Sequence, residues 1–315
     1  MPTKPFEPLL HRELSKVLAK EIVDIASPLL RELVDYSTNA FERCQTSLTG
    51  RLDEHLPVLA SYLHVIETTD GIQVLVENAC GIPPIPLLRS SFEAVLAIEY
   101  ILQDDCQRRS ASWMVHYIHQ RLNQLETLDS SSPKGRAIVE ALATDQMGAR
   151  FTLPMIDVSP AAKNLQSLLG DSFYQVAESE YQRVYRSRKR KPAWYSLFHG
   201  PMNLRELADR VGRAAQYDFL YRHWSTVSHA ADLSRYLGRT KDGSPAFASL
   251  RRPKDVKEAP GLAASIILDA TRKVLKEFRG GEEASFRRWY RKEVRARFLA
   301  LNRVGGSHQD EAVPT

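Results

Sequence analysis

The chain has 315 residues, 43% of them hydrophobic, and a formal net charge of +5 at pH 7. This is enough apolar material for a chain that buries its own core, and no uncharged apolar run reaches the roughly eighteen residues that a membrane-spanning helix needs. The first apolar stretch, residues 14–33, carries several charged side chains, so we expect no signal peptide. We therefore expect a cytoplasmic protein with no membrane contact.

Apolar side chains recur every three or four residues along most of the chain, and strand-like alternation is nearly absent. This periodicity predicts an all-α fold, a single helical-bundle domain of about ten helices with a disordered C-terminal tail. We expect an N-terminal helical extension over residues 1–55, a helical core domain with the functional site over 56–302, and the tail over 303–315.

Proline and glycine set several of the predicted boundaries, because both residues disfavour helix interiors. Pro28 predicts a kink, Asp70-Gly71 predicts a helix end, and Asp171 is a predicted helix N-cap. A basic loop is predicted over 186–191, and one long helix or a closely joined pair over 212–238. The expected helices, in order, cover residues 8–48, 56–67, 74–80, 87–102, 104–128, 134–147, 161–169, 172–185, 204–211, 212–238, 259–278 and 282–301.

Arg89 and Glu93 lie four residues apart in an otherwise apolar helix and so share one of its faces. Charged groups in such a helix are expected to be paired or to face a cavity, since an unpaired buried charge is costly. Two interpretations stay open: a salt bridge at the edge of the core, or an arginine that Glu93 positions to bind a phosphate or carboxylate.

A second polar group lies in a later helix, from Tyr221 through Arg222 and Ser225 to His229. Seven residues at 100° each leave Arg222 and His229 about 20° apart, so both are expected to line one groove with Ser225 between them. The same spacing recurs at other arginines of the chain, so the surrounding tyrosines and hydroxyls, rather than the spacing, favour a site here.

Basic side chains are concentrated in two regions. For each region two interpretations stay open: a positively charged surface that binds nucleic acid, or an ordinary solvated surface. Residues 272–303 hold eleven Lys or Arg against four Glu. The other region is the basic segment 186–191, which two aromatic residues follow closely. The candidate binding site takes six residues from this part of the chain: Arg188, Lys189, Arg190, Lys191, Trp194 and Tyr195.

The order of these features resembles a family of uncharacterised bacterial helical proteins. Its members show an R-x-x-x-E helix, a W-Y element and a Y-x-x-x-S-x-x-x-H helix, matched here by Arg89/Glu93, Trp194-Tyr195 and Tyr221/Ser225/His229. The resemblance covers about residues 56–237 and implies an all-helical fold. The pair Arg222 and His229 also resembles the R-x(4–6)-H motif of the HEPN superfamily, which includes metal-independent ribonucleases of toxin and antiphage systems.

The HEPN resemblance implies an endoribonuclease whose site is commonly built across a homodimer. His229 would move the proton of the 2′-hydroxyl or of the leaving oxygen, and Arg222 with Arg89 would stabilise the phosphorane. Glu93 would orient Arg89, and Ser225 or Tyr195 would hold the phosphate. The basic segment 186–191 would bind RNA.

Metal and cofactor chemistry finds no support in the sequence. Glu-x-x-His and HExxH pairs are missing, the three cysteines form no ligand pattern, and no glycine-rich phosphate loop is present. His116 and His119 have helical spacing but no carboxylate at a matching position. We expect no metal and no cofactor, and free buried thiols at Cys44, Cys80 and Cys106.

Two alternatives to the ribonuclease stay open. The same groove is also suited to a non-catalytic module that binds a nucleotide, a nucleic acid or a partner protein such as an antitoxin. In the other alternative, Arg89, Glu93 and His229 form a buried structural network, and deleting one partner would strand the others.

Overall fold

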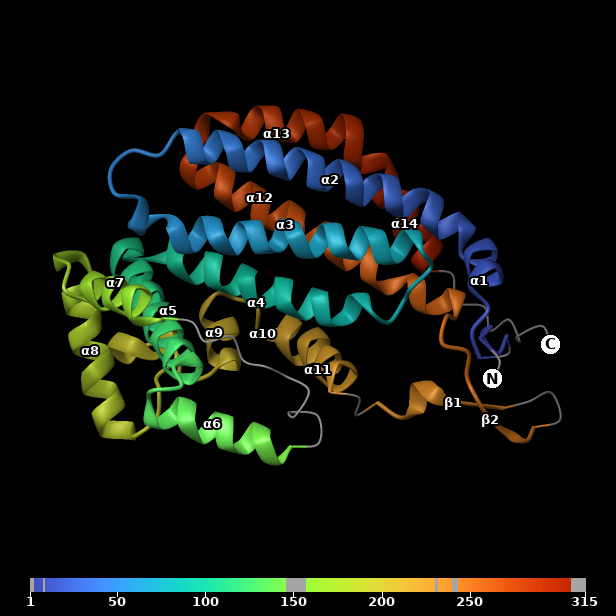
Figure 1. Cartoon of the computed structure of the whole chain (residues 1–315). Helices are drawn as coiled ribbons and strands as arrows, with labels where there is room; N and C mark the ends of the chain where they lie inside the picture. Colours follow the sequence, from blue (N-terminus) through green and yellow to red (C-terminus); the bar gives the residue numbers. More distant parts are fainter. Residues whose placement is uncertain (1–2, 8, 146–156, 230–231, 240–242, 307–315) are drawn as a thin grey trace. The chain divides into compact units, whose positions relative to one another are not determined.

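A computed structural model (Figure 1) describes residues 3–7, 9–145, 157–229, 232–239 and 243–306. The described residues are mostly helical, so the predicted all-α class is confirmed. The chain forms two compact units. Unit 1 comprises Met1–Leu52, Val58–Leu102 and Ala208–Thr315, and unit 2 comprises Asp53–Pro57 and Gln103–Leu207.

Unit 1 holds most of the described helices together with the one small sheet among the described residues. The short strands β1 (Leu237–Arg239) and β2 (Pro245–Phe247) pair antiparallel, with Leu237 opposite Phe247. Its helices are α1 (Arg12–Leu18), α2 (Lys20–Thr46), α3 (Leu56–Glu77), α4 (Pro84–Gln103), α10 (Ala214–Gln216), α11 (Arg222–Ser228), α12 (Glu258–Phe278), α13 (Glu283–Trp289) and α14 (Arg295–Gly306), and α9 (Leu204–Arg210) contains the boundary with unit 2.

The core of unit 1 forms where α2 packs against α12 and α14 (Figure 1). Leu29 and Leu30 of α2 and Ile267 and Val274 of α12 are fully buried, and each such side chain stabilises the fold by about 1.5–3 kcal/mol. The N-terminal helix is therefore part of this compact unit, whereas the sequence analysis set residues 1–55 apart as an extension. Pro28 lies inside the continuous helix α2.

A small buried hydrogen-bond network ties three of these helices together. The Tyr62 hydroxyl and the Ser37 Oγ each lie 2.9 Å from the Thr271 Oγ1. Burial raises the pKa of Tyr62, so its phenol stays protonated and available as a donor. Because all three hydroxyls find partners, the apolar core accommodates them without a stranded polar group.

The predicted helix end at Asp70-Gly71 is wrong, because α3 runs without a break through both residues. Ile72 and Val76 beyond the glycine are fully buried, and their burial outweighs the roughly 1 kcal/mol by which glycine disfavours a helix. A Cβ on Gly71 would lie only 3.3 Å from Leu87 Cδ1 of α4. The glycine therefore allows a close approach of α4, rather than ending α3.

The predicted helix over 212–238 is much shorter in the structure. After Gly212, whose φ is +78°, the chain forms α10, one π-helical turn at Tyr217–Tyr221, and then α11, which ends at Ser228. A second π-helical turn, Tyr290–Val294, joins α13 to α14. Such turns carry i→i+5 hydrogen bonds, which hydrophobic spacing does not reveal, and they are frequent at functional sites.

Unit 2 is a smaller helical cluster in which α5 packs against α8. Asp171 caps α8 by accepting a hydrogen bond from the Phe173 amide, as predicted. Arg186 and Arg188 lie in the last turn of α8, so the predicted basic loop begins as a helix. The helices are α5 (Cys106–Leu128), α6 (Pro133–Thr144), α7 (Ser159–Leu169) and α8 (Ser172–Arg188), followed by the 3₁₀ segment Trp194–His199.

All three cysteines are free, as predicted, with Cys44 and Cys80 buried and Cys106 half-buried. Among the described residues, no helix is both long enough and apolar enough to cross a membrane. The predicted C-terminal tail is helical up to Gly306, and the rest of it lies outside the described residues.

Candidate functional site

Arg89 of α4 stands at the centre of a polar cluster in unit 1. Its Nη2 donates a 2.8 Å hydrogen bond to the Tyr221 hydroxyl, which in turn donates a 2.7 Å bond to Oε1 of Glu93. The same carboxylate oxygen lies 3.5 Å from the Arg89 Nε, an ion-pair distance without hydrogen-bond geometry. Arginine, phenol and carboxylate thus form a closed ring of polar contacts.

His229, at the C-terminal end of α11, completes this cluster. Its Nε2 lies 3.4 Å from Nη1 of Arg89, longer than the usual 2.7–3.2 Å of a hydrogen bond. We call Arg89, Glu93, Tyr221 and His229 the Arg89 cluster. The side chains of Arg89 and Glu93 are 26% and 44% exposed and His229 is exposed, so the cluster opens to solvent and is not the buried network considered above.

Aromatic packing holds Tyr221 in place. Its ring stacks on Tyr217 at a centroid distance of 4.8 Å and packs against Phe92 of α4 at 5.9 Å, while Trp224 meets Phe92 edge-on. The Arg89 guanidinium carbon lies 4.9 Å from the Tyr221 ring centroid, within cation–π range. Burial, together with its bond to Glu93, raises the pKa of Tyr221 to about 12, so its phenol stays protonated.

A second ionic network anchors the start of the segment that carries Tyr221 and His229. Arg213 donates from Nε to Oε2 of Glu99 at 2.6 Å and also contacts Asp269 of α12. Lys273 bridges Glu99 and Asp269. The contacts pair residue 213 with 99, residue 221 with 93, and residue 229 with 89. The partner numbers fall as the segment advances, so the segment runs antiparallel along α4.

Arg222 and Ser225 do not join the Arg89 cluster through any contact among the described residues. Arg222 is exposed, whereas its neighbours Tyr221 and Trp224 are buried. Helical geometry continues from Arg222 to His229, since the His229 amide donates to the Ser225 carbonyl at 3.1 Å. Of these three residues, only His229 contacts Arg89 among the described residues.

The remaining predicted binding residues belong to unit 2. Trp194 and Tyr195 pack edge-to-face with ring centroids 5.5 Å apart, and both are half-buried. Arg188, Lys189 and Arg190 are exposed, and Lys189 ends α8 in a left-handed conformation. Burial and the nearby Lys134 lower the pKa of Lys191.

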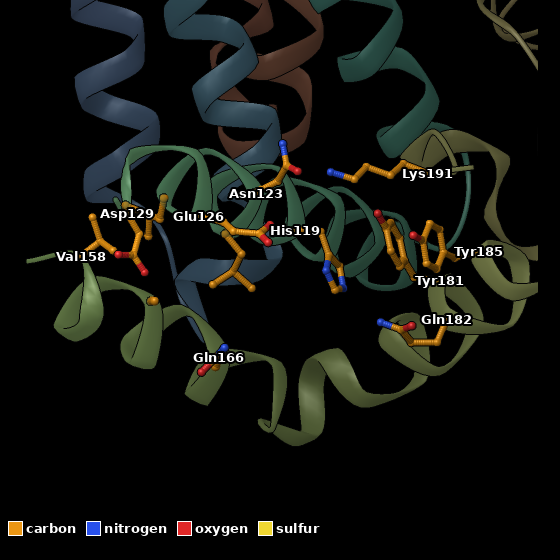
Figure 2. A pocket seen from close by; sticks show the side chains of 13 residues that line it. His119, Asn123, Glu126, Asp129, Val158, Gln166, Tyr181, Gln182, Tyr185 and Lys191 are labelled. Atoms are coloured by element: carbon orange, nitrogen blue, oxygen red, sulfur yellow. The ribbon is translucent and has the colours of Figure 1, made fainter. Parts of the chain in front are cut away.

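Unit 2 contains a pocket of about 490 Å³ formed by α5, α7 and α8 (Figure 2). Lys191 extends over it toward Asn123, and Tyr181 and Tyr185 form its α8 wall. His119 donates from Nε2 a 2.7 Å hydrogen bond to Oε2 of Glu178 and stacks on the Tyr181 ring at 4.2 Å. The sequence analysis found no carboxylate partner for His119 within its own helix; the partner comes from α8.

Sequence reasoning found all four members of the Arg89 cluster but not the ionic network of Arg213, Glu99, Asp269 and Lys273. Only the i, i+4 spacing of Asp269 and Lys273 signalled it. Across the ranges that the structure describes, no group of three His, Cys, Asp or Glu side chains is arranged to hold a metal ion. The cluster offers a cation, an imidazole, a phenol and a carboxylate, which suit anion binding and proton transfer.

An all-helical protein with an exposed arginine–histidine cluster is thus the class that the fold and the site define. The model of a family of unknown function, DUF5677, matches residues 55–245, more than half of the chain, and the chain belongs to this family. The match confirms the predicted uncharacterised helical family. No curated protein and no solved structure matches the chain.

Proposed function

We propose that the Arg89 cluster is the active site of a metal-independent endoribonuclease related to the HEPN superfamily. The contact between the Arg89 Nη1 and the His229 Nε2 is the observation that carries this proposal. It joins a phosphate-binding cation and a proton-transfer group on a solvent-open surface. The HEPN resemblance extends the proposal to a homodimer in the cytoplasm that acts as a toxin or antiphage effector.

The geometry supports a role for His229 as general base. Arg89 can only donate, so the tautomer of His229 that suits this contact has its lone pair on Nε2. That lone pair can accept the proton of a 2′-hydroxyl, whose oxygen attacks the adjacent phosphorus. The bond from phosphorus to the 5′-oxygen then breaks, and the leaving oxygen takes a proton from water. The products are a 2′,3′-cyclic phosphate and a 5′-hydroxyl.

Arg89 would stabilise the negative charge that develops on the phosphorane oxygens. Nη1 is the nitrogen that would donate to the phosphate, because its 3.4 Å contact with His229 is long. Nη2 already donates to Tyr221 at 2.8 Å. Tyr221 and Glu93 are positioning residues that fix the plane of the guanidinium. With a pKa of about 12, Tyr221 is a hydrogen-bond donor near neutral pH and a poor base.

RNA cleavage in EDTA, followed by analysis of the new ends, tests the proposal. The wild-type protein should produce 2′,3′-cyclic phosphates and 5′-hydroxyls, and His229→Ala should not. His223→Ala is the matched control, because His223 is an exposed histidine of the same helix and makes no contact with Arg89 among the described residues. A folded wild-type protein that leaves RNA intact would contradict the proposal.

The second candidate function is a non-catalytic module that binds a nucleotide or nucleic acid through the same cluster. The observation that favours it is that Tyr221 fixes Nη2 of Arg89 at 2.8 Å while Nη1 has only a long 3.4 Å contact, so one donor nitrogen of a fixed guanidinium is left for an anion. Arg89→Ala would then abolish nucleotide binding while His229→Ala retains it. Equilibrium binding measured with both variants separates this module from the ribonuclease.

A further inference from the structure

The outer face of α13 and α14 carries a line of arginines that the Arg89 cluster does not use. Arg288, Arg291, Arg295 and Arg303 follow one another at intervals of three, four and eight residues, so they share one helical face. All four are exposed. We call these residues the arginine row. At a rise of 1.5 Å per residue the row is about 22 Å long.

The opposite face of these helices is fixed to the core of unit 1. Phe286, Val294 and Leu301 are buried, and the Trp289 indole donates a 2.7 Å hydrogen bond to Glu32 of α2 while stacking on Tyr36. Figure 1 shows α13 lying along α2. Because the inner face is anchored in this way, the row is held on a rigid support and faces solvent.

Carboxylates neutralise the cations beside the row but not the row itself. Arg287 pairs with Glu283 at 2.6 Å and Arg279 with Glu282 at 2.8 Å. Within the described ranges, no member of the row forms an ion pair; Arg291 donates only to a backbone carbonyl. Four neighbouring guanidinium groups without counter-charges repel one another, and an external polyanion would relieve this repulsion.

We propose that the arginine row binds the phosphodiester backbone of a nucleic acid strand. Guanidinium groups match phosphate oxygens with paired donors, and a single line of cations matches a linear polyanion better than a planar membrane. The apolar face of α13 and α14 is buried, so these helices have no free apolar side for insertion into a lipid surface. Among the described residues 288–303, Leu299 is the one exposed large apolar side chain, at 43%.

This inference goes beyond the proposed function, because it assigns a binding surface that contains no member of the Arg89 cluster. The row contacts backbone phosphates alone, so it should not discriminate between sequences or between RNA and DNA. Where the Arg89 cluster cleaves RNA, the row would hold the strand and raise its local concentration.

The test uses fluorescence anisotropy with a labelled 2′-O-methyl RNA of about 20 nucleotides, which is longer than the row. This probe lacks the attacking hydroxyl, so binding is measured without cleavage. The triple variant Arg288→Gln/Arg291→Gln/Arg295→Gln should bind roughly 100-fold more weakly at about 0.1 M salt, and its salt slope should fall by about 2, because each lost phosphate contact contributes about 0.7 to that slope.

The control variant Arg31→Gln/Arg183→Gln/Arg287→Gln removes the same charge from arginines that already have carboxylate partners. It should bind within about 3-fold of the wild type, since paired cations release few counterions. Equal losses in the two triple variants would overturn the inference, as would preferential binding of the wild type to vesicles of anionic phospholipid. Because the 2′-O-methyl probe cannot be cleaved, this result stands apart from the outcome of the cleavage assay.

Discussion

Nη1 of Arg89 lies 3.4 Å from Nε2 of His229, although the two residues are 140 positions apart in the chain. The antiparallel course of residues 213–229 along α4 produces this contact, and Tyr221 lies at its midpoint with hydrogen bonds to both Arg89 and Glu93. The predictions below test the parts of this arrangement separately.

Tyr221→Phe should destabilise the protein by about 1–3 kcal/mol, because it strands an Arg89 donor and a Glu93 acceptor that the hydroxyl now joins. Chemical denaturation at neutral pH measures this loss. Tyr217→Phe is the matched control: its ring keeps the stack on Tyr221, and its hydroxyl forms no hydrogen bond among the described residues. Equal stability of the two variants would show that the hydroxyl of Tyr221 does not support the cluster.

Arg213→Ala should cost about 1–3 kcal/mol, since Glu99, whose side chain is only 7% exposed, loses its bidentate partner and keeps only Lys273. Arg272→Ala also removes a partner of Asp269, but this arginine is 59% exposed, so its loss should cost less than about 1 kcal/mol. Unfolding free energies of both variants provide the comparison. A small effect of Arg213→Ala would mean that the segment is held along α4 by its aromatic residues alone.

Gly81→Ala should destabilise unit 1 by about 1–3 kcal/mol or more, because the new Cβ would lie 2.3 Å from the backbone carbon of Asp255. Backbone atoms cannot move aside as a flexible side chain can. Gly280→Ala introduces the same methyl group where no atom lies within 4 Å and serves as the control. Thermal unfolding distinguishes the two, and equal melting temperatures would contradict the close packing at Gly81.

His116 should make the stability of the protein depend on pH. Burial lowers the pKa of His116, and this effect outweighs the hydrogen bond from Nδ1 to the Pro192 carbonyl at 3.0 Å, which raises it. The Gln120 amide donates to Nε2 at 2.9 Å and so favours the neutral imidazole. Its contribution is therefore fully present above pH 6.5, the ordinary value, and is lost as the pH falls through the lowered pKa of the folded state.

The measurement for this prediction is the denaturation midpoint of the wild type and of His116→Gln between pH 8 and pH 5. The wild type should lose more stability over this range than the variant, whose side chain does not titrate. Parallel pH profiles would assign the acid sensitivity to other groups.

The sequence predicted the helical class, because apolar periodicity is a local signal. The placement of Arg89 and His229 in one site was a hypothesis from the family resemblance, since no local signal joins residues 140 positions apart. The sequence did not predict that α3 continues through Gly71, since the burial of Ile72 and Val76 by other helices outweighs local propensity. The π-helical turn at Tyr217–Tyr221 was missed for a related reason: aromatic packing against Phe92 accompanies it, and spacing alone does not show it.

The site residues show the same difference between local signals and contacts that form only in the folded chain. Glu93 lies one helical turn from Arg89 and was found by its spacing, whereas Glu99 and Arg213 lie 114 positions apart and meet only in the folded chain. Arg222 was assigned to the groove from regular helical geometry, which continues to His229, but the spacing alone did not show that His229 and not Arg222 contacts Arg89.

The most direct test of the central claim is a mutant cycle on RNA cleavage in EDTA with Arg89→Ala, His229→Ala and the double variant. Residues that act as one catalytic unit have non-additive effects, so the double variant should be no slower than His229→Ala. The 2′-O-methyl RNA should still bind to every variant. Additive losses in the cycle, or cleavage by both single variants at the wild-type rate, would contradict a shared active site of Arg89 and His229.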